Sequence, residues 1–278
     1  MLSRLILAAL SCLVLQACSQ AQDLTGEETP RRIISLDYCA DQYVLKFADR
    51  DHILALSPDA EKHFSFMRNA AVGLQKVRPR TADVLALEPD LVVRSYGGGP
   101  NVTTFLERAG VPVVQIGFPG SIAEVRSEVV RLGTELGAPE KAKSTADEMD
   151  RRLAAVASGK TPSKEALYMT PYGFTTGEGT LTNELITTAG LLNFQDRPGW
   201  NPLPLERLAY ERPDLVAAAY FEGKTNHEDN WSAARHPVAR AQMRDLPVVP
   251  LQGAWMACGG WFQLEAVEAL AKAAQADL

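Results

Sequence analysis

The sequence lacks the short glycine-containing signatures of several large enzyme classes. Its 278 residues contain no Gly-x-Ser-x-Gly nucleophile elbow, no Gly-x-x-x-x-Gly-Lys phosphate loop and no Gly-x-Gly-x-x-Gly after an apolar run. The run Gly97-Gly98-Gly99 is followed by a proline and has no lysine beside it, which is typical of a flexible turn. These absences argue against serine hydrolases, P-loop enzymes and dinucleotide-dependent enzymes.

Histidine is also scarce, and acidic residues outnumber basic ones. The four histidines, His52, His63, His227 and His236, show no metal-ligand spacing, so a zinc or manganese site made by the chain alone is not predicted. The net charge of −6 argues against nucleic acid or an anionic membrane surface as a partner. Beyond the first residues no apolar run approaches membrane-spanning length, and the composition is that of a soluble globular body.

The N-terminus has the pattern of a secretory signal peptide. Arg4 precedes an apolar run, Leu5 to Leu15, that is too short to span a bilayer. The run closes on Leu15-Gln16-Ala17-Cys18, which resembles the lipobox of bacterial lipoproteins, in which the cysteine takes a lipid and becomes the first mature residue.

We therefore predict a signal peptide at 1–17, a lipidated Cys18 and a polar tether at 18–30. The signal peptide places the protein in the periplasm. Because two acyl chains give a stable anchor, we expect it to be attached to a membrane through lipid alone. Cleavage after Ala21, where small residues also suit signal peptidase, is the alternative and would give a soluble periplasmic protein.

One segment of the chain occurs twice. Leu85-Ala86-Leu87-Glu88-Pro89-Asp90-Leu91-Val92 recurs as Leu208-Ala209-Tyr210-Glu211-Arg212-Pro213-Asp214-Leu215-Val216, and a tyrosine, Tyr96 or Tyr220, lies seven residues past each proline. Each copy predicts a short helix stopped by proline and then a strand. The copies are too far apart for a solenoid repeat, so they indicate two similar α/β lobes.

Strand and helix patterns alternate on both sides of a helical segment. This pattern predicts an α/β fold of two Rossmann-like lobes with central parallel sheets, residues 31–120 and 161–278, joined by a long helix at 121–160. Gly137-Ala138-Pro139 interrupts that segment, so it is read as one long helix with a break or two helices end to end. The expected strands are 32–36, 53–56, 91–94, 111–116, 167–170, 215–219 and 248–251, and the expected helices include 40–48, 81–87, 183–189, 238–243 and 263–274.

The order of these features resembles a known family. The strand at 32–36, the Leu-Ala-Leu-Glu-Pro-Asp-Leu-Val-Val segment, Gly110-Val111-Pro112-Val113-Val114, the mid-chain helix and the second Pro-Asp-Leu-Val together resemble helical-backbone (class III) periplasmic binding proteins. That family delivers iron–siderophore complexes, heme or vitamin B12 to ABC importers. The resemblance runs from Arg31 to the C-terminus.

The resemblance implies a monomeric solute-binding lipoprotein rather than an enzyme. Its partners would be a metal chelate and an ABC permease dimer with its ATPase subunits, without an intrinsic cofactor. The lobes would flank a shallow cleft, and the helix would limit closure to small rocking. A hydrolase on the same scaffold, centred on Cys39, is the distant alternative, although nothing in the sequence places a base beside that thiol.

Aromatic residues supply the expected ligand site. Ligands of open α/β sheets bind beyond the carboxyl ends of strands, where several aromatics fall. Trp200 stands where vitamin B12-binding members of the family carry a cleft tryptophan. Only Arg94 and Arg68 are basic residues near the cleft, which favours a corrinoid or near-neutral chelate over an anionic siderophore, with heme as an alternative. The predicted ligand-binding residues are Tyr38, Tyr96, Tyr172, Trp200, Tyr220 and Trp255.

Two acids are predicted to dock on the permease. In the family an acid at the start of the pre-proline helix of each lobe contacts permease arginines. Glu206 matches this position in the second lobe, whereas in the first lobe the matching residue is Ala82 and the acid, Asp83, lies one residue later. Helix capping or stabilisation of the helix dipole would explain both acids equally well.

Cys39 and Cys258 remain after processing, beside the lipidated cysteine. In an oxidising periplasm they are expected to form a disulfide. Thiolate ligation of a metal in the ligand, and two unrelated buried thiols, are the alternatives.

Overall fold

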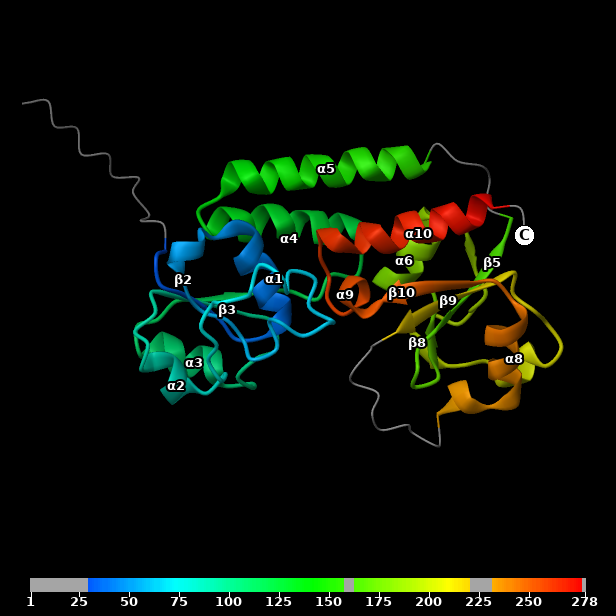
Figure 1. Cartoon of the computed structure of the whole chain (residues 1–278), viewed down its shortest axis with the longest axis horizontal. Helices are drawn as coiled ribbons and strands as arrows, with labels where there is room; N and C mark the ends of the chain where they lie inside the picture. The colour runs from blue at the N-terminus through cyan, green and yellow to red at the C-terminus, as the bar shows by residue number, and fades with distance from the viewer. Residues whose placement is uncertain (1–29, 158–162, 221–231, 277–278) are drawn as a thin grey trace, which may run out of the picture.

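Two α/β lobes lie side by side in the computed structural model, which describes residues 30–157, 163–220 and 232–276 (Figure 1). The expected signal peptide, Cys18 and the tether up to residue 29 lie outside the described residues. Within the described ranges, no helix combines the length and apolar character needed to cross a membrane.

The N-terminal lobe is built on a four-stranded parallel sheet of order β2-β1-β3-β4. Its two central strands, β1 and β3, are buried along their whole length, because helices cover both faces of the sheet. The strands are β1 (Ile33–Ser35), β2 (Ile53–Ala55), β3 (Leu91–Arg94) and β4 (Val113–Gln115).

Helices on opposite faces of this sheet bury alternate residues of its strands. Ile33 and Val93 join the core that α1 (Tyr38–Phe47) covers, and Ile34 and Val92 join the core under α2 (Thr81–Leu85) and α3 (Val102–Arg108). Asp37 caps α1, its carboxylate accepting a hydrogen bond from the Ala40 N–H at 3.0 Å. A short 3-10 turn, η1 (Arg50–His52), leads into β2.

The C-terminal lobe repeats this plan. Its parallel sheet has the order β10-β9-β5-β7. Read from β7, this is the second, first, third and fourth strand of the sheet in chain order, as in the first lobe. This shared topology confirms the predicted fold class. The elements are β5 (Glu165–Met169), β6 (Phe174–Thr176), α6 (Leu181–Thr188), β7 (Leu192–Asn193), β8 (Trp200–Pro202), α7 (Leu205–Leu208), β9 (Leu215–Tyr220), η2 (Ala233–Arg235), α8 (Pro237–Asp245), β10 (Val248–Gln252), α9 (Gly253–Met256), η3 (Trp261–Gln263) and α10 (Leu264–Gln275).

The recurring Pro-Asp pair has the same task in both lobes. The Asp90 carboxylate accepts hydrogen bonds from the backbone N–H groups of Arg31 (2.8 Å) and Arg32 (3.0 Å), just before β1. The Asp214 carboxylate accepts one from Glu165 N–H, at the start of β5, at 2.7 Å. In each lobe this aspartate therefore fixes the third strand against the first, so the duplicated motif is a register anchor.

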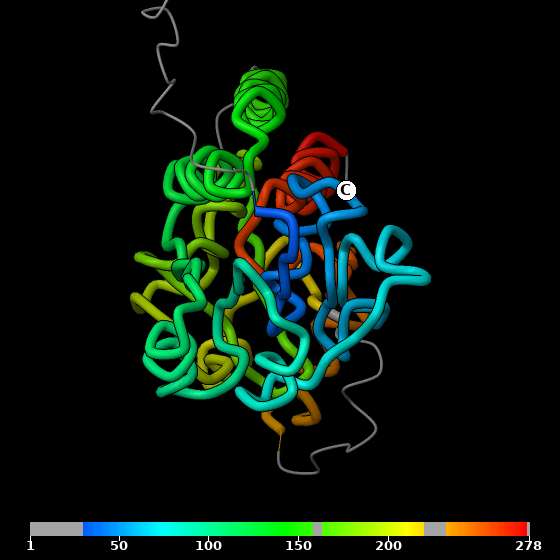
Figure 2. The backbone as a smooth tube through the Cα atoms, turned by 90° about the vertical axis from the view of Figure 1, so that its left-hand side faces the viewer, coloured from blue at the N-terminus to red at the C-terminus, as the bar shows by residue number. Residues whose placement is uncertain are grey.

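The segment between the lobes is a helical hairpin. α4 (Ile122–Glu135) ends at a turn in which Gly137 adopts φ +78°, and α5 (Pro139–Ala157) returns beside it. The Arg126–Asp150 ion pair (2.9 Å) joins the two helices across the hairpin, and Figure 2 shows α5 nearly end-on, above α4 and α10. This corrects the expectation of one long helix or two helices end to end.

A glycine explains how closely the two helices approach. A Cβ atom at Gly133 would lie 2.4 Å from the Cβ of Ala142 and 3.2 Å from the Phe47 ring. The hairpin therefore packs on α1 with no room for a side chain at that point.

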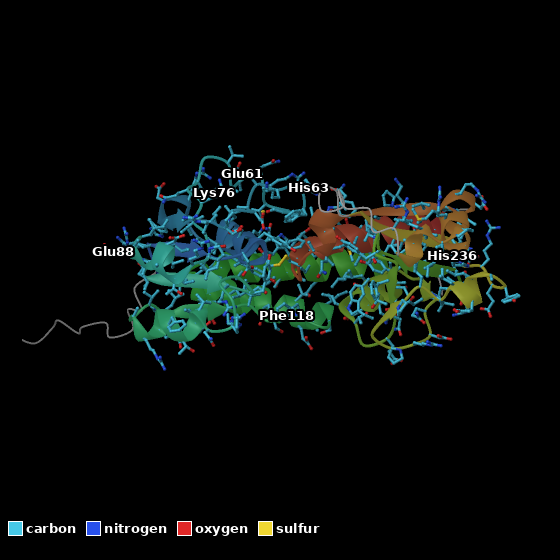
Figure 3. All side chains as sticks on the ribbon, turned by 90° about the horizontal axis from the view of Figure 1, so that it is seen from below. Glu61, His63, Lys76, Glu88, Phe118 and His236 are labelled. Carbon is cyan, nitrogen blue, oxygen red and sulfur yellow. A yellow bond between two sulfur atoms is a disulfide. The ribbon has the colours of Figure 1, made fainter. Side chains whose placement is uncertain are left out.

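The lobes are joined covalently between α1 and the loop after α9. Cys39 and Cys258 form a disulfide with a Cα–Cα distance of 5.5 Å, visible as a yellow bond near the middle of Figure 3. Four residues along α1, the Tyr43 hydroxyl donates a hydrogen bond to the Gly259 carbonyl at 3.0 Å. Trp261 packs its ring edge-on against Tyr43 at a centroid distance of 5.5 Å. The two α/β lobes thus share one continuous core.

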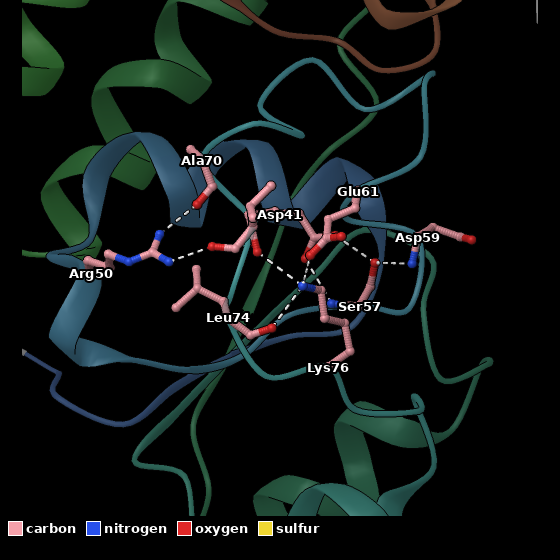
Figure 4. Close-up of polar contacts among 10 residues, drawn as sticks. Asp41, Arg50, Ser57, Asp59, Glu61, Ala70, Leu74 and Lys76 are labelled. Atoms are coloured by element: carbon pink, nitrogen blue, oxygen red, sulfur yellow. Dashed lines mark hydrogen bonds and ion pairs between the residues drawn. The ribbon is translucent and has the colours of Figure 1, made fainter.

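A buried carboxyl, Asp41 of α1, holds the ends of the first two strands together. It accepts hydrogen bonds from the Ser57 N–H (3.0 Å) and the Ser57 hydroxyl (2.5 Å) (Figure 4). The Ser35 hydroxyl donates a further hydrogen bond to the same carboxyl. Burial raises the pKa of Asp41 from 3.8 to about 7, against the opposing effect of these hydrogen bonds. The folded protein therefore retains a proton on Asp41 at pH values where the unfolded chain has lost it.

We expect Asp41 to make stability depend on pH between about 4 and 7. Because its pKa is higher in the folded state, its contribution to stability is complete below about pH 4 and is lost as the pH rises towards 7, by at most on the order of 4 kcal/mol. Asp41→Asn imitates the protonated carboxyl and should remove this dependence. Urea unfolding of both proteins across this range measures the difference, and parallel pH profiles would contradict the assignment.

The disulfide should stabilise the fold strongly, because it closes a loop of 219 residues. Changing both Cys39 and Cys258 to serine is expected to lower the free energy of unfolding by about 5 kcal/mol, as the chain-entropy model gives for a loop of this length. Either single variant should lose a similar amount, since each breaks the same bond. Denaturant titration measures the loss, and a double variant as stable as the wild type would contradict it.

Candidate functional site

A cavity of about 470 Å³ opens between the two lobes. Its residues come from the ends of strands and the loops that follow them, at the carboxyl edge of both sheets. Two side chains form the N-terminal wall and the rest form the C-terminal wall and floor. The lining residues are Tyr38, Phe64, Tyr168, Thr170, Tyr172, Phe174, Thr182, Trp200, Met256 and Ala257.

The N-terminal wall is an aromatic cluster. Tyr38, the first residue of α1, meets Phe64 edge-on at a centroid distance of 4.8 Å and Tyr96 at 5.8 Å. The hydroxyls of Tyr38 and Tyr96 also form a hydrogen bond. Tyr96 is 47% exposed and borders the cavity through this contact.

One buried carboxylate holds this wall in place. Asp37 accepts hydrogen bonds from the backbone N–H groups of Ser95 (2.7 Å), Tyr96 (3.0 Å) and Gly97 (2.8 Å) while capping α1. Gly97 is needed there because a Cβ would lie 2.3 Å from the Leu36 carbonyl oxygen. Asp37 therefore ties the loop that carries Tyr96 to the helix that carries Tyr38.

The wall tyrosines are neutral phenols. Burial is the main cause that raises the pKa of both Tyr38 and Tyr96, and the nearby carboxylates Asp37 and Asp59 raise both further. Burial alone raises the pKa of Tyr168 on the opposite wall. These hydroxyls are suited to donating hydrogen bonds to a ligand rather than to binding a metal as phenolates.

The C-terminal wall is shaped by a two-stranded antiparallel ribbon, β6 with β8. The ribbon pairs Thr176 with Trp200 and places the indole, 58% exposed, over Tyr168 at a ring-centroid distance of 6.1 Å. Tyr172 lies in the turn before the ribbon, where Gly173 has φ +79° and its N–H bonds to the Thr170 carbonyl at 2.9 Å. The turn and ribbon thus present Tyr172, Phe174 and Trp200 to the cavity.

The floor adjoins the covalent joint between the lobes. Met256 and Ala257 line the cavity, and the next residue, Cys258, is bonded to Cys39, the neighbour of Tyr38. Because both cysteines are in the disulfide, neither is free to act as a nucleophile or as a thiolate ligand to a metal.

The cavity brings together three of the six residues predicted to bind ligand, namely Tyr38, Tyr172 and Trp200. Tyr96 stands at its border, and Tyr220 ends β9, although its side chain lies outside the described residues. Trp255 is half-buried and packs against the main core, and it is not among the residues that line this cavity, so its contact with a ligand stays a prediction.

Sequence reasoning missed several lining residues. Tyr168 has the pattern of a core strand residue and is in fact buried, yet it also reaches the cavity. Thr170 and Thr182 carry no signal that separates them from other polar residues. Met256 and Ala257 could have been found through their position beside Cys258, once that cysteine was placed at the cleft.

The two acids predicted to dock on the permease occupy equivalent helices. Asp83 lies on α2, immediately before β3, and forms an ion pair with Arg78 at 3.1 Å. Glu206 lies in the first turn of α7, before β9, and is exposed. Within the described part of the chain, no ion pair holds Glu206.

Charge is absent from the described lining. None of the ten lining residues is Asp, Glu, Lys, Arg or His. Among the described residues, no group of three or more His, Cys, Asp or Glu side chains could hold a metal ion. The described lining therefore offers aromatic faces and hydroxyls to a ligand.

The profile of the periplasmic binding protein family matches residues 49–230. The chain belongs to this family. Among curated proteins, the cobalamin-binding protein of Halobacterium salinarum is 28% identical over 207 residues, which cover 69% of this chain and 55% of that protein. The vitamin B12-binding protein of Salmonella paratyphi A is 28% identical over 181 residues, covering 62% of this chain and 64% of the relative. The chain thus spans a little over half of the first relative and just under two thirds of the second.

Solved structures of this family share the fold. The periplasmic heme-binding protein of Vibrio cholerae superimposes with a TM-score of 0.72 at 17% identity, over 88% of this chain and 99% of that one. The periplasmic vitamin B12-binding protein of the same organism gives a TM-score of 0.65 at 20% identity, over 90% and 99%. These likenesses support the two-lobe architecture and carry no argument about the ligand.

Proposed function

We propose that the protein is the solute-binding component of an ABC importer and that it captures a corrinoid in the cavity between its lobes. The observation that carries this proposal is the lining, which is rich in aromatics and, in its described part, free of charged side chains. A flat macrocycle with amide side groups fits such a lining through ring contacts and hydrogen bonds to neutral hydroxyls. The names of the curated relatives, which are cobalamin- and vitamin B12-binding proteins, support the same ligand.

Heme is the second ligand to test, because the aromatic lining also suits its flat ring. Heme carries two carboxylates, however, and the described lining offers no cation to pair with them. Anionic ferric siderophores meet the same difficulty. The corrinoid is therefore preferred on electrostatic grounds.

A ligand panel tests this proposal. Cyanocobalamin, hemin and a ferric catecholate siderophore are titrated separately into the protein by calorimetry, and the absorption spectrum of protein purified from its native host identifies any ligand that it carries. We expect saturable binding of cyanocobalamin and at least tenfold weaker binding of the anionic chelates. Tight binding of hemin or the siderophore with no cyanocobalamin binding would overturn the corrinoid assignment.

Trp200 should be a major contact, since its indole is exposed at the cavity wall. Trp200→Ala is expected to weaken ligand binding by about 1 to 3 kcal/mol through loss of the ring face. Tyr210→Ala is the matched control, because Tyr210 is an aromatic residue that is 92% exposed and does not line the cavity. Equal affinities for the two variants would mean that the ligand binds elsewhere.

Delivery to a permease completes the proposal. Lipidation at Cys18 would hold the protein at a membrane through the tether, and the acids on α2 and α7 would meet arginines of the permease. Glu206 is the better placed of the two, because Asp83 is already paired with Arg78.

Reversing the charge at Glu206 should separate binding from delivery. Glu206→Arg places like charges opposite each other, so cellular uptake should fall while ligand affinity stays near the wild-type value. Asp83→Arg should act in the same direction more weakly. Glu140→Arg, an exposed acid at the start of α5, is the matched control. If Glu206→Arg lowers affinity as much as uptake, the residue belongs to the cleft or to folding.

A further inference from the structure

A second cavity, of about 390 Å³, lies where the helical hairpin meets both lobes. Its lining comes from the end of α1 and a nearby loop in the first lobe, from α5, and from η3 and the start of α10 in the second lobe. None of its residues lines the cavity between the lobes. The lining residues are Lys46, Phe66, Lys141, Ser144, Thr145, Glu148, Met149, Arg151, Arg152, Trp261, Leu264 and Glu265.

The lining of this cavity is positively charged, although the chain as a whole is negatively charged. It holds four cations and two carboxylates, a net charge of +2, in a protein whose net charge is −6. Arg151 pairs with Glu148, and Arg152 pairs with Glu265 at 2.9 Å and with Glu268 on the same face of α10. Both arginines are therefore neutralised.

Lys46 and Lys141 account for the net positive charge of the lining. Among the described residues, no carboxylate lies within ion-pair distance of Lys46 or Lys141. Burial lowers the pKa of Lys46, and the charge of Lys141 lowers it further. Both ammonium groups therefore belong to the lining of one cavity, and a bound anion would offset their positive charge.

The same cavity has an apolar floor. The Lys46 ammonium lies 5.4 Å from the centroid of the Trp261 ring. Phe66 packs beside that indole at a centroid distance of 6.5 Å, and Met149 and Leu264 complete the surface. A volume of this size is sufficient for a small organic molecule.

We propose that this second cavity binds a small organic anion, a phosphate ester or a carboxylate that carries an apolar ring. Its charged group pairs with the ammonium groups of Lys46 and Lys141, and its ring lies against Phe66, beside the indole that Lys46 covers. The Ser144 hydroxyl adds a hydrogen-bond donor at the mouth of the cavity. This site is independent of the ligand proposed for the cleft.

Occupancy of the cavity has a structural consequence. Because the lining comes from the first lobe, the hairpin and the second lobe, a bound anion holds all three together. It binds the folded protein and not the unfolded chain, so it raises the melting temperature by mass action.

Phenyl phosphate is the probe, titrated by calorimetry into the full-length protein. We expect saturable binding and an increased melting temperature, with binding weakened about tenfold or more by Lys46→Gln or Lys141→Gln, since each removes a charged hydrogen-bond donor. Lys143→Gln is the matched control, because Lys143 lies on α5 outside the cavity and is paired with Asp147 at 2.8 Å. It should bind the probe as the wild type does.

Two further measurements separate the contribution of the apolar ring from that of the charged group. Inorganic phosphate should bind more weakly than phenyl phosphate, because it lacks the ring, and Trp261→Phe should reduce the quenching of tryptophan fluorescence by the probe. Circular dichroism confirms that each variant is folded. The proposal is overturned if wild-type protein does not bind phenyl phosphate, or if Lys143→Gln weakens binding as much as Lys46→Gln and Lys141→Gln do.

Discussion

The joint between α1 and the loop after α9 is the constraint on which the geometry of both cavities depends. The Cys39–Cys258 bond, the Tyr43–Gly259 hydrogen bond and the packing of Trp261 on α1 all tie the first lobe to the second. Tyr38 precedes one cysteine and Ala257 precedes the other, so the two walls of the cleft start from a fixed separation. The hairpin adds a second connection, and the lobes therefore have little freedom to move apart.

The duplicated segment made most of this architecture predictable from sequence. A proline that ends a helix and an aspartate that anchors the next strand occur in both lobes because each lobe must fix its third strand against its first. Those local requirements produce the same strand order twice. The tyrosines that follow the strands were predictable for the same reason, because parallel strands end at one edge of a sheet. Tyr38 and Tyr172 accordingly meet in one cavity.

Features set by long-range packing were not predictable in this way. The hairpin turn at Gly137 has the same local sequence signals as a break in a continuous helix, and only the packing of Gly133 on Ala142 and Phe47 decides between them. The β6–β8 ribbon joins short segments whose pairing depends on a turn at Gly173 and on tertiary context. The position of Trp255 before the last helix suggested a cleft residue, whereas its side chain packs against the main core.

The helix α1 connects the two cavities physically. It begins with Tyr38 at the aromatic cleft, carries Cys39 and Tyr43 in the interlobe joint, and ends beside the second cavity, where Lys46 lies on Trp261. The charge is divided along the same helix: the described lining at its start is uncharged, whereas the lining at its end has a surplus of positive charge. The sites proposed for a neutral macrocycle and for a small anion therefore lie at opposite ends of one helix and share no lining residue.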